Sequence, residues 1–101
     1  MENQIQVNPE NIASRIYFFR GEKVILDFDL AILYGVPVKA LKQTVRRNLK
    51  RFPPDFMFSL TSEEHKILRS QFVTLGWGTY TKYLPFAFTE QGVAMLFGIL
   101  N

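Results

Sequence analysis

The chain has 101 residues, of which 48% are hydrophobic and 15% aromatic, and its net charge is +3. This length suits one compact domain and is too short for a second. The absence of cysteine excludes a disulfide framework, a thiolate nucleophile and cysteine-bound zinc or iron. No apolar run approaches the roughly 20 residues of a membrane-spanning helix, and the N-terminus does not resemble a signal peptide. We therefore expect a cytoplasmic protein without membrane contact.

The N-terminal part of the chain predicts an arm followed by a β-hairpin. Residues 1–14 are rich in Asn, Gln and Glu and lack hydrophobic periodicity, so we expect a flexible arm ahead of a domain over residues 15–101. Residues 16–19 and 23–26 are β-branched and aromatic, which favours strands. Gly21 lies between them and can adopt the positive φ of a tight turn.

Two helices are expected next, at the spacing of a helix-turn-helix. Asp27 or Asp29 can cap the first helix, which runs to Tyr34 and ends at Gly35. The second is predicted over residues 38–51, where apolar residues recur every three or four positions before a pair of prolines. The members of this apolar stripe are Leu41, Val45, Leu49 and Phe52. The positions typical of a helix-turn-helix are occupied by Ala31, Gly35, Val36 and Leu41.

The following segment predicts a strand, a helix and a loop. Residues 56–60 favour a strand, and Thr61 with Glu64 forms a capping box for a helix that runs to about Ser70. Residues 71–83 are rich in Thr, Gly and aromatic residues, which indicates an irregular loop with exposed aromatics.

The C-terminal segment completes an α+β fold. Residues 83–88 predict a further strand with Pro85 at an edge or a bulge. Thr89 is expected to cap a final helix that runs towards the C-terminus. The expected domain therefore has an N-terminal hairpin, a helix-turn-helix-like pair, further short strands and two more helices.

The candidate functional site is the polar face of the second helix. Six of the twelve Lys and Arg residues lie between Leu30 and Pro54, with no Asp or Glu among them. At about 100° per residue, most of them project opposite the apolar stripe. Lys and Arg bind DNA phosphates, while Gln, Asn and Arg can read base edges in the major groove. We therefore predict a surface for double-stranded DNA made of Lys39, Lys42, Gln43, Arg46, Arg47, Asn48, Lys50 and Arg51.

The alternative is that this basic face is only solvated, as charged faces of surface helices commonly are. Solvated helices usually alternate the sign of their charges, because Glu and Lys four residues apart attract each other. Here Lys42, Arg46 and Lys50 place like charges four residues apart, and their repulsion favours a polyanionic partner.

No set of residues indicates catalysis or a metal site. His65 is the single histidine, and near a helix start an exposed or hydrogen-bonded imidazole is expected rather than a general base. The acidic pairs 27 with 29 and 63 with 64 fall at helix starts, where capping explains them better than magnesium binding. Phosphate loops, nucleophile elbows and zinc-binding helices are absent. We expect neither an enzyme nor a cofactor.

Three strings carry a family resemblance: residues 16–36 (IYFFRGEKVILDFDLAILYGV), 45–61 (VRRNLKRFPPDFMFSLT) and 83–101 (YLPFAFTEQGVAMLFGILN). Over residues 15–101 the chain resembles the open-reading-frame-six N-terminal (ORF-six-N) domain family, a neighbour of the KilA-N and Bro-N modules. The resemblance implies a DNA-binding module of phage, prophage and bacterial proteins, often fused to a different C-terminal domain.

Two positions depart from the family pattern. Val38 stands where relatives often have a Thr or Ser that caps the basic helix, and Pro54 stands where an acidic residue is common. Relatives also continue beyond the position of Asn101, so the resemblance implies a domain cut from a longer protein.

Two functions are open at this point. The first is the DNA-binding domain of a phage or prophage-type transcriptional regulator or antirepressor, which reads duplex DNA through residues 38–51. The hairpin or the loop around Trp77 would be an auxiliary contact. The second is a protein interaction module, in which the basic helix meets an acidic repressor, a phage protein or the missing C-terminal domain. Its aromatic contacts would be Trp77, Tyr80 and Tyr83. A homodimer fits either function.

Overall fold

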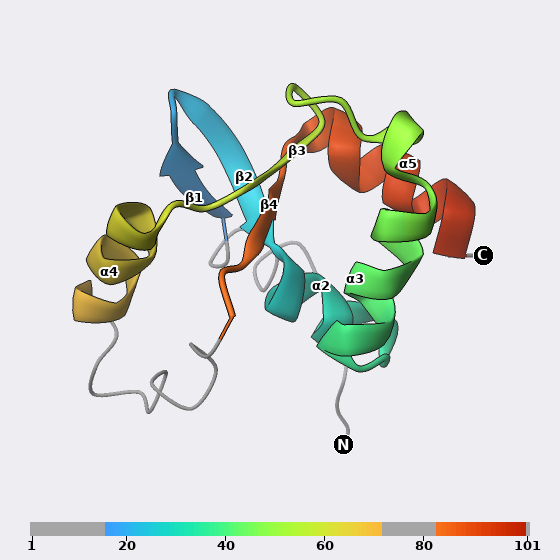
Figure 1. Cartoon of the computed structure of the whole chain (residues 1–101), viewed down its shortest axis with the longest axis horizontal. Coiled ribbons are helices and arrows are strands. Elements are labelled where there is room, and N and C mark those ends of the chain that lie inside the picture. The colour runs from blue at the N-terminus through green and yellow to red at the C-terminus, as the bar shows by residue number, and fades with distance from the viewer. Residues whose placement is uncertain (1–15, 72–82, 101) are drawn as a thin grey trace, which may run out of the picture.

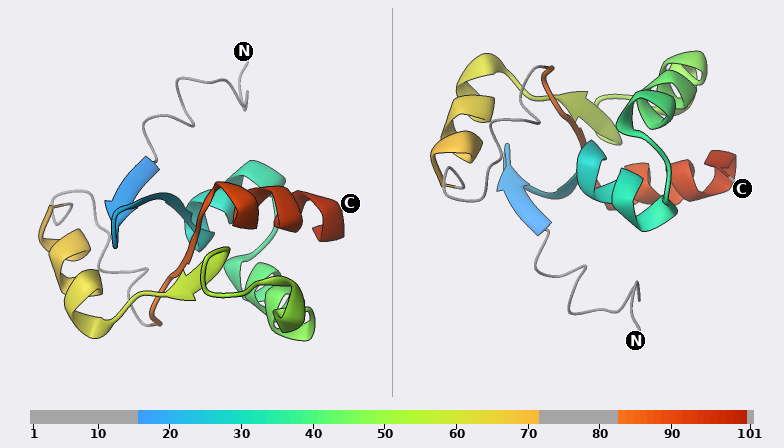
Figure 2. Two further views of the ribbon diagram at one scale, coloured as in Figure 1. Left: turned by 90° about the horizontal axis from the view of Figure 1, so that it is seen from above. Right: turned by 90° about the horizontal axis from the view of Figure 1, so that it is seen from below.

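The computed structural model describes residues 16–71 and 83–100 of the chain (Figure 1). The predicted arm over residues 1–14 and nearly all of the predicted loop over residues 71–83 lie outside these ranges. The described residues form a four-stranded antiparallel sheet with helices packed around it (Figure 2). The predicted α+β class is confirmed.

The hairpin turns through two left-handed residues. Strand β1 (Ile16–Phe19) pairs antiparallel with β2 (Glu22–Leu26), and Phe19 stands opposite Glu22. Arg20 has a φ of 56° and Gly21 a φ of 75°, which is the turn backbone that matches the twist of the paired strands. The predicted hairpin is confirmed, and Arg20 shares the conformation expected of Gly21 alone.

The last strand in the chain is central in the sheet. The order β1-β2-β4-β3 places β4 (Phe86–Phe88) between β2 and β3 (Met57–Ser59). Phe88 pairs with one residue of each neighbour. Pro85 precedes β4, where it removes no ladder hydrogen bond, and its carbonyl accepts the N–H of Leu60 at 2.9 Å. The predicted proline at an edge or bulge is therefore a proline at the start of a central strand.

Helix α2 (Asp27–Tyr34) follows β2 directly and has no side-chain cap. Its N-cap is Leu26, so the prediction that Asp27 or Asp29 caps this helix is wrong. Asp27 is already helical, and its carboxylate accepts a hydrogen bond from the N–H of Phe86 in the sheet. Asp27 therefore ties the start of α2 to the sheet instead of acting as the N-cap residue.

The end of α2 agrees with the prediction. Gly35 has a φ of 69°, and its N–H donates to the carbonyl of Ile32 at 3.1 Å. The N–H of Val36 donates to Ala31 at 3.0 Å. This pair of bonds satisfies the free carbonyls of a helix end, and the left-handed conformation explains the glycine.

Helix α3 (Val38–Arg47) docks on the core through Leu41 and Val45, which are fully buried. Its N-cap is Pro37, without a side-chain hydrogen bond. The helix ends earlier than predicted, because Asn48 leaves the helical conformation with a φ of −122°. The prolines at positions 53 and 54 deny the chain further helical hydrogen bonds.

A 3-10 turn, η1 (Leu49–Arg51), replaces the last predicted turn of α3. The change of helical phase at Asn48 directs Leu49 outwards, and 57% of Leu49 is exposed. Phe52 instead enters the core, where its ring packs edge-on to Phe88 at a centroid distance of 5.9 Å. The prediction that Leu49 belongs to the buried stripe is wrong.

Helix α4 (Ser62–Gln71) begins with the predicted capping box. The backbone N–H of Thr61 donates to Oε1 of Glu64 at 2.8 Å, and the N–H of Glu64 donates to Oγ1 of Thr61 at 3.1 Å. Glu64 also accepts two hydrogen bonds from Arg20. The capping box therefore starts α4 and also attaches it to the hairpin turn.

Helix α5 (Glu90–Leu100) is fixed at its start by Thr89 and Gly92. The hydroxyl of Thr89 accepts the N–H of Gly92 at 3.3 Å, as the predicted cap requires, and donates to the carbonyl of Asp55 at 2.8 Å. A Cβ at Gly92 would collide with the backbone of Phe56. The threonine and the glycine thus seat α5 against the turn before β3.

Two apolar clusters hold the elements together. The first lies among α2, α3, α5 and the sheet, and includes Leu30, Leu41, Phe88 and Leu96. The second joins the hairpin to α4 and includes Val24, Leu60 and Leu68. Burying each such side chain contributes roughly 1.5 to 3 kcal/mol relative to leaving it exposed. Within the described ranges, no helix is long and apolar enough to cross a membrane.

Candidate nucleic-acid interface

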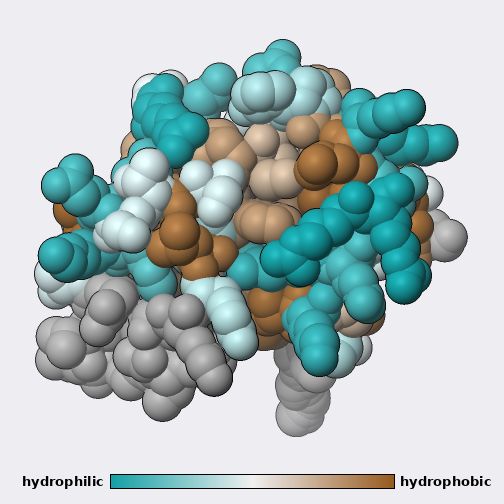
Figure 3. All heavy atoms as spheres, viewed as in Figure 1, coloured by the Kyte–Doolittle hydropathy of each residue, from teal (hydrophilic) through white to brown (hydrophobic). Residues whose placement is uncertain are grey.

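The exposed face of α3 and η1 is rich in Lys and Arg and carries no acidic residue. Hydrophilic side chains cluster over both elements in Figure 3. Six of the predicted DNA-binding residues are exposed on this surface, which we term the basic face: Lys39, Gln43, Arg46, Arg47, Lys50 and Arg51. The structure therefore brings together five cations and one amide on consecutive elements.

Lys42 is absent from the basic face. Only 8% of the residue is exposed, and its Nζ donates to the carbonyl of Leu84 at 2.8 Å and lies 3.4 Å from Oδ2 of Asp27. Its position between the apolar stripe and the polar face lets the ammonium turn inwards to these partners. The prediction that Lys42 contacts DNA does not fit this position.

Asn48 is also occupied within the protein. The residue is half-buried, and its Nδ2 donates to the carbonyl of Thr44 at 2.8 Å. This bond satisfies one of the free carbonyls at the end of α3. Asn48 therefore serves the helix end rather than standing free to read a base edge.

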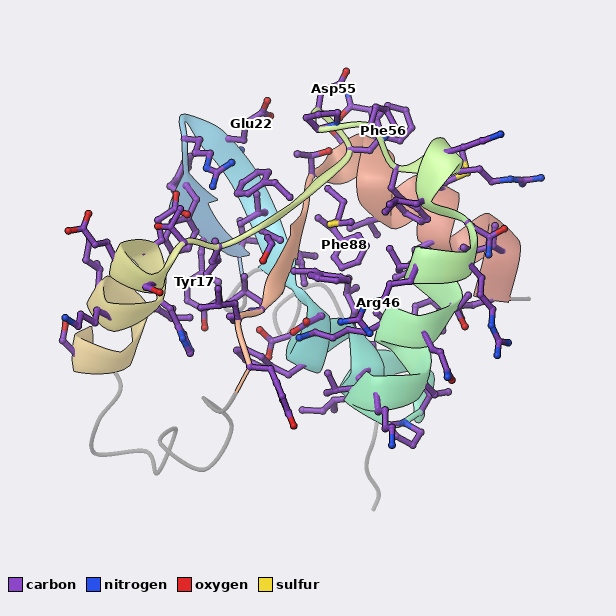
Figure 4. All side chains as sticks on the ribbon, viewed as in Figure 1. Tyr17, Glu22, Arg46, Asp55, Phe56 and Phe88 are labelled. Carbon is purple, nitrogen blue, oxygen red and sulfur yellow. The ribbon has the colours of Figure 1, made fainter. Side chains whose placement is uncertain are left out.

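Arg46 lies at the border between the basic face and the sheet. Its guanidinium carbon lies 5.5 Å from the ring centroid of Phe86, and Nζ of Lys42 lies 5.0 Å from the same centroid. Such contacts attract a cation to the ring face. Figure 4 shows Arg46 reaching from α3 towards β4. Arg46 remains exposed while the ring restrains its position.

Asp27 is the buried acidic partner of Lys42. Burial raises the pKa of its carboxyl, and the N–H of Phe86 and the ammonium of Lys42 oppose this rise. Only 1% of Asp27 is exposed, so the carboxylate neutralises Lys42 and does not project into the basic face.

The other sequence candidates do not assemble into a reactive site. His65 is buried in α4 rather than exposed, with 7% of its surface accessible. In the part of the chain that the structure describes, no group of three or more His, Asp or Glu side chains could hold a metal ion. Trp77 and Tyr80 lie outside the described residues.

A second surface, an apolar groove of about 450 Å³, lies between the hairpin and α5. Its lining includes Ile16, Ile25, Val93 and Phe97, with the charged residues Lys23 and Glu90. Sequence reasoning missed this groove because it joins residues far apart in the chain. The one available signal is α5 itself, whose string EQGVAMLFGIL is apolar on nearly every side.

The fold and the basic face define a small α+β domain that presents a cationic helix on a scaffold joined by short turns. Over residues 14–99 the chain matches the family model of the ORF6N domain. The chain belongs to this family, as the resemblance of the three strings predicts. No curated protein sequence matches it, and neither does any solved structure.

Proposed function

We propose that this domain binds double-stranded DNA and serves a phage or prophage-type transcriptional regulator or antirepressor in the cytoplasm. The observation that carries the proposal is the basic face, where five cations stand together on α3 and η1 without a carboxylate among them. Membership of the ORF6N domain family is consistent with a phage-type regulatory domain. We expect no catalytic activity and no cofactor.

The proposed contacts follow from the order of the exposed side chains. Helices α2 and α3 are joined by a short turn over residues 35–37, which suits a helix-turn-helix that lays its second helix in the major groove. Gln43, Arg46 and Arg47 lie on α3 and have the chemistry to read adenine and guanine edges. Lys39, Lys50 and Arg51 flank them and would hold phosphates.

A merely solvated face is the alternative, and the pairing of Lys42 with Asp27 removes one cation from the basic face. Lys42 points inwards and α3 ends before Lys50, so the expected row of like charges four residues apart on one helix is not formed. Even so, Arg46, Arg47, Lys50 and Arg51 fall within six consecutive positions. Repulsion within this group is relieved by a polyanion, which supports DNA as the partner.

A titration of a mixed-sequence duplex at several salt concentrations tests the proposal. On a mixed-sequence duplex, which offers no matched bases, Arg46 and Arg47 are expected to lie on phosphates with Lys39, Lys50 and Arg51. If these five cations each neutralise one phosphate, log affinity should fall with log salt at a slope of about −4 to −5. The variant Arg46→Glu/Arg47→Glu should lose binding while keeping its fold, because neither residue is buried. A matched pair of single variants is Arg47→Glu and Lys66→Glu, which change the net charge equally, and Lys66 is exposed on α4, outside the basic face and the hairpin. A flat salt response would contradict the proposal, as would equal losses in both variants.

The apolar groove favours a second candidate, a protein interaction module. Monomeric proteins seldom expose a large continuous apolar patch, and Phe97 at the groove is 47% exposed. In this case an acidic repressor or phage protein would bind at the basic face, or a protein would bind in the groove, and the domain would act without binding DNA. Co-purification with a protein that survives nuclease treatment, without any duplex binding, would favour this candidate.

A further inference from the structure

In the described part of the chain, one face of the hairpin is only partly covered. Ile16 stands opposite Ile25 in the β1–β2 pairing, and Phe18 stands opposite Lys23. These four side chains therefore share one face of the sheet, which we term the hairpin face. Ile16 is 36% exposed and Phe18 is 69% exposed, whereas the other face of the hairpin packs against α4. Because a sheet buries an apolar face against another element, the hairpin face has room for a partner.

Helix α5 also presents an apolar side to solvent. Glu90, Ala94 and Phe97 follow one another at spacings of four and three residues, so they lie on one side of the helix, which we term the helix face. All three are exposed, and Glu90 is the single charged residue of α5. A Cβ at the neighbouring Gly98 would meet nothing within 4 Å. A helix that is apolar on nearly every side is normally buried all round, so the helix face also has room for a partner.

The two faces are the walls of the apolar groove. The hairpin face contributes Ile16, Lys23 and Ile25 to the lining, and the helix face contributes all three of its residues. Figure 2 shows α5 beside the hairpin. The groove of about 450 Å³ between them is unfilled by the described residues. Each wall needs what the other supplies, because a sheet face packs on a helix and a helix packs on a sheet.

The charges of the two faces decide which surfaces fit together. The hairpin face carries Lys23 and the helix face carries Glu90, and neither residue forms an ion pair with the described residues. Contact between two hairpin faces would bring two lysines together, and contact between two helix faces would bring two glutamates together. Such like-charge contacts are unfavourable. Contact between the hairpin face of one copy and the helix face of another pairs opposite charges instead.

We propose that the groove is the interface of a homodimer in which α5 of each copy packs on the hairpin face of the other. A two-fold axis makes this contact twice, because an isologous interface repeats every pairing in both directions. Lys23 of one copy then pairs with the partner's Glu90, and Phe18 and Phe97 become buried. The inference goes beyond the proposed function and does not depend on it, because the interface lies outside the basic face.

Sedimentation equilibrium of the full chain without DNA tests the association. The average mass should rise with protein concentration towards twice the 11.8 kDa of one chain. Phe18→Ser should weaken dimerisation about a hundredfold, because each dimer buries this side chain twice, and the exposed position of Phe18 lets the variant keep its fold. Ile67→Ser is the matched control, since Ile67 is 56% exposed on α4, and it should dimerise like the wild type.

A charge exchange tests the orientation of the two copies. Lys23→Glu and Glu90→Lys each place like charges together at both contacts of the dimer, and each should weaken dimerisation about tenfold. Lys23→Glu/Glu90→Lys restores opposite charges, so its dissociation constant should return to within about threefold of the wild-type value. Lys66→Glu makes the same change of charge on α4 and should leave dimerisation unchanged.

Three results would overturn the inference. The first is a monomer at every concentration. The second is a dimer that survives Phe18→Ser, because it would form through another surface. The third is a double charge variant that dimerises no better than the two single variants. Failure of the chain to bind duplex DNA refutes the proposed function and leaves this inference standing, since dimerisation is measured without DNA.

Discussion

Nζ of Lys42 lies 3.4 Å from Oδ2 of Asp27, and this pair joins the first residue of α2 to the middle of α3. Both residues are buried, at 8% and 1% exposure. Removing one partner of a buried pair leaves the other charge uncompensated, which costs more than the pair itself contributes. The pair therefore couples α2 to α3, and the stability of variants at either residue measures this coupling.

We predict that Asp27→Ala lowers the free energy of unfolding by about 3 kcal/mol. Asp27→Asn/Lys42→Met should be more stable than Asp27→Ala, since no unpaired charge is then buried. Urea denaturation of the two single variants, Asp27→Asn and Lys42→Met, and of their double variant gives the interaction energy as a double-mutant cycle. Purely additive losses would show that the two side chains are not coupled.

The pH dependence of stability should carry the signature of Asp27. Burial raises the pKa of this carboxyl above its ordinary 3.8, so the folded state holds the proton more tightly than the unfolded state. The associated stability is fully present below 3.8 and is lost as pH rises through the folded pKa. The wild type should therefore lose free energy of unfolding relative to Asp27→Asn as pH rises from 3.8 through the folded pKa of Asp27, and urea denaturation at several pH values measures this change. A stability difference between the wild type and Asp27→Asn that stays constant with pH would contradict the raised pKa of Asp27.

Glu64 should show the opposite sign. Nε of Arg20 donates to Oε2 of Glu64 at 3.1 Å and Nη2 donates to Oε1 at 3.0 Å, and this lowers the pKa of Glu64 below its ordinary 4.5. The stability that Glu64 contributes is present above 4.5 and is lost as pH falls through its folded pKa. Glu64→Gln retains an acceptor for the cap, so the advantage of the wild type over this variant should shrink on acidification. An advantage that grows at acidic pH would reverse the predicted sign.

Features that depend on near neighbours in the chain were accessible to sequence reasoning. Gly35 and the Thr61–Glu64 capping box follow from helix ends, whose free backbone groups need partners within a few residues. The inward position of Lys42 could not be predicted in this way, because its partners at positions 27 and 84 are brought to it only by the packing of α2, α3 and β4. Helical periodicity places it on the border of the polar face, and such a border position allows either an inward or an outward ammonium.

Replacing Gly92 or Gly98 by alanine should have opposite effects on stability, although both glycines lie on α5. A Cβ at Gly92 would collide with the carbonyl of Phe56, whereas a Cβ at Gly98 meets nothing within 4 Å. Gly92→Ala should destabilise the domain by about 3 kcal/mol, at the upper end for an overpacked site. Gly98→Ala should be neutral or stabilising by up to about 1 kcal/mol, because alanine favours the helix. Thermal unfolding of the two variants measures the contrast, and equal melting temperatures would contradict the close approach of α5 to the turn before β3.

The end of α3 provides a final matched pair, Leu41 and Leu49. Both lie on the apolar stripe predicted from an uninterrupted helix, yet Leu41 is fully buried and Leu49 is 57% exposed. Leu41→Ala should lower the free energy of unfolding by about 3 kcal/mol through lost burial and a residual cavity. Leu49→Ala should change it by less than about 0.5 kcal/mol, as at other exposed positions. Chemical denaturation of both variants tests the break at Asn48. If the two losses were equal, α3 would continue through Leu49 and the four basic residues from Arg46 to Arg51 would be arranged along one regular helix.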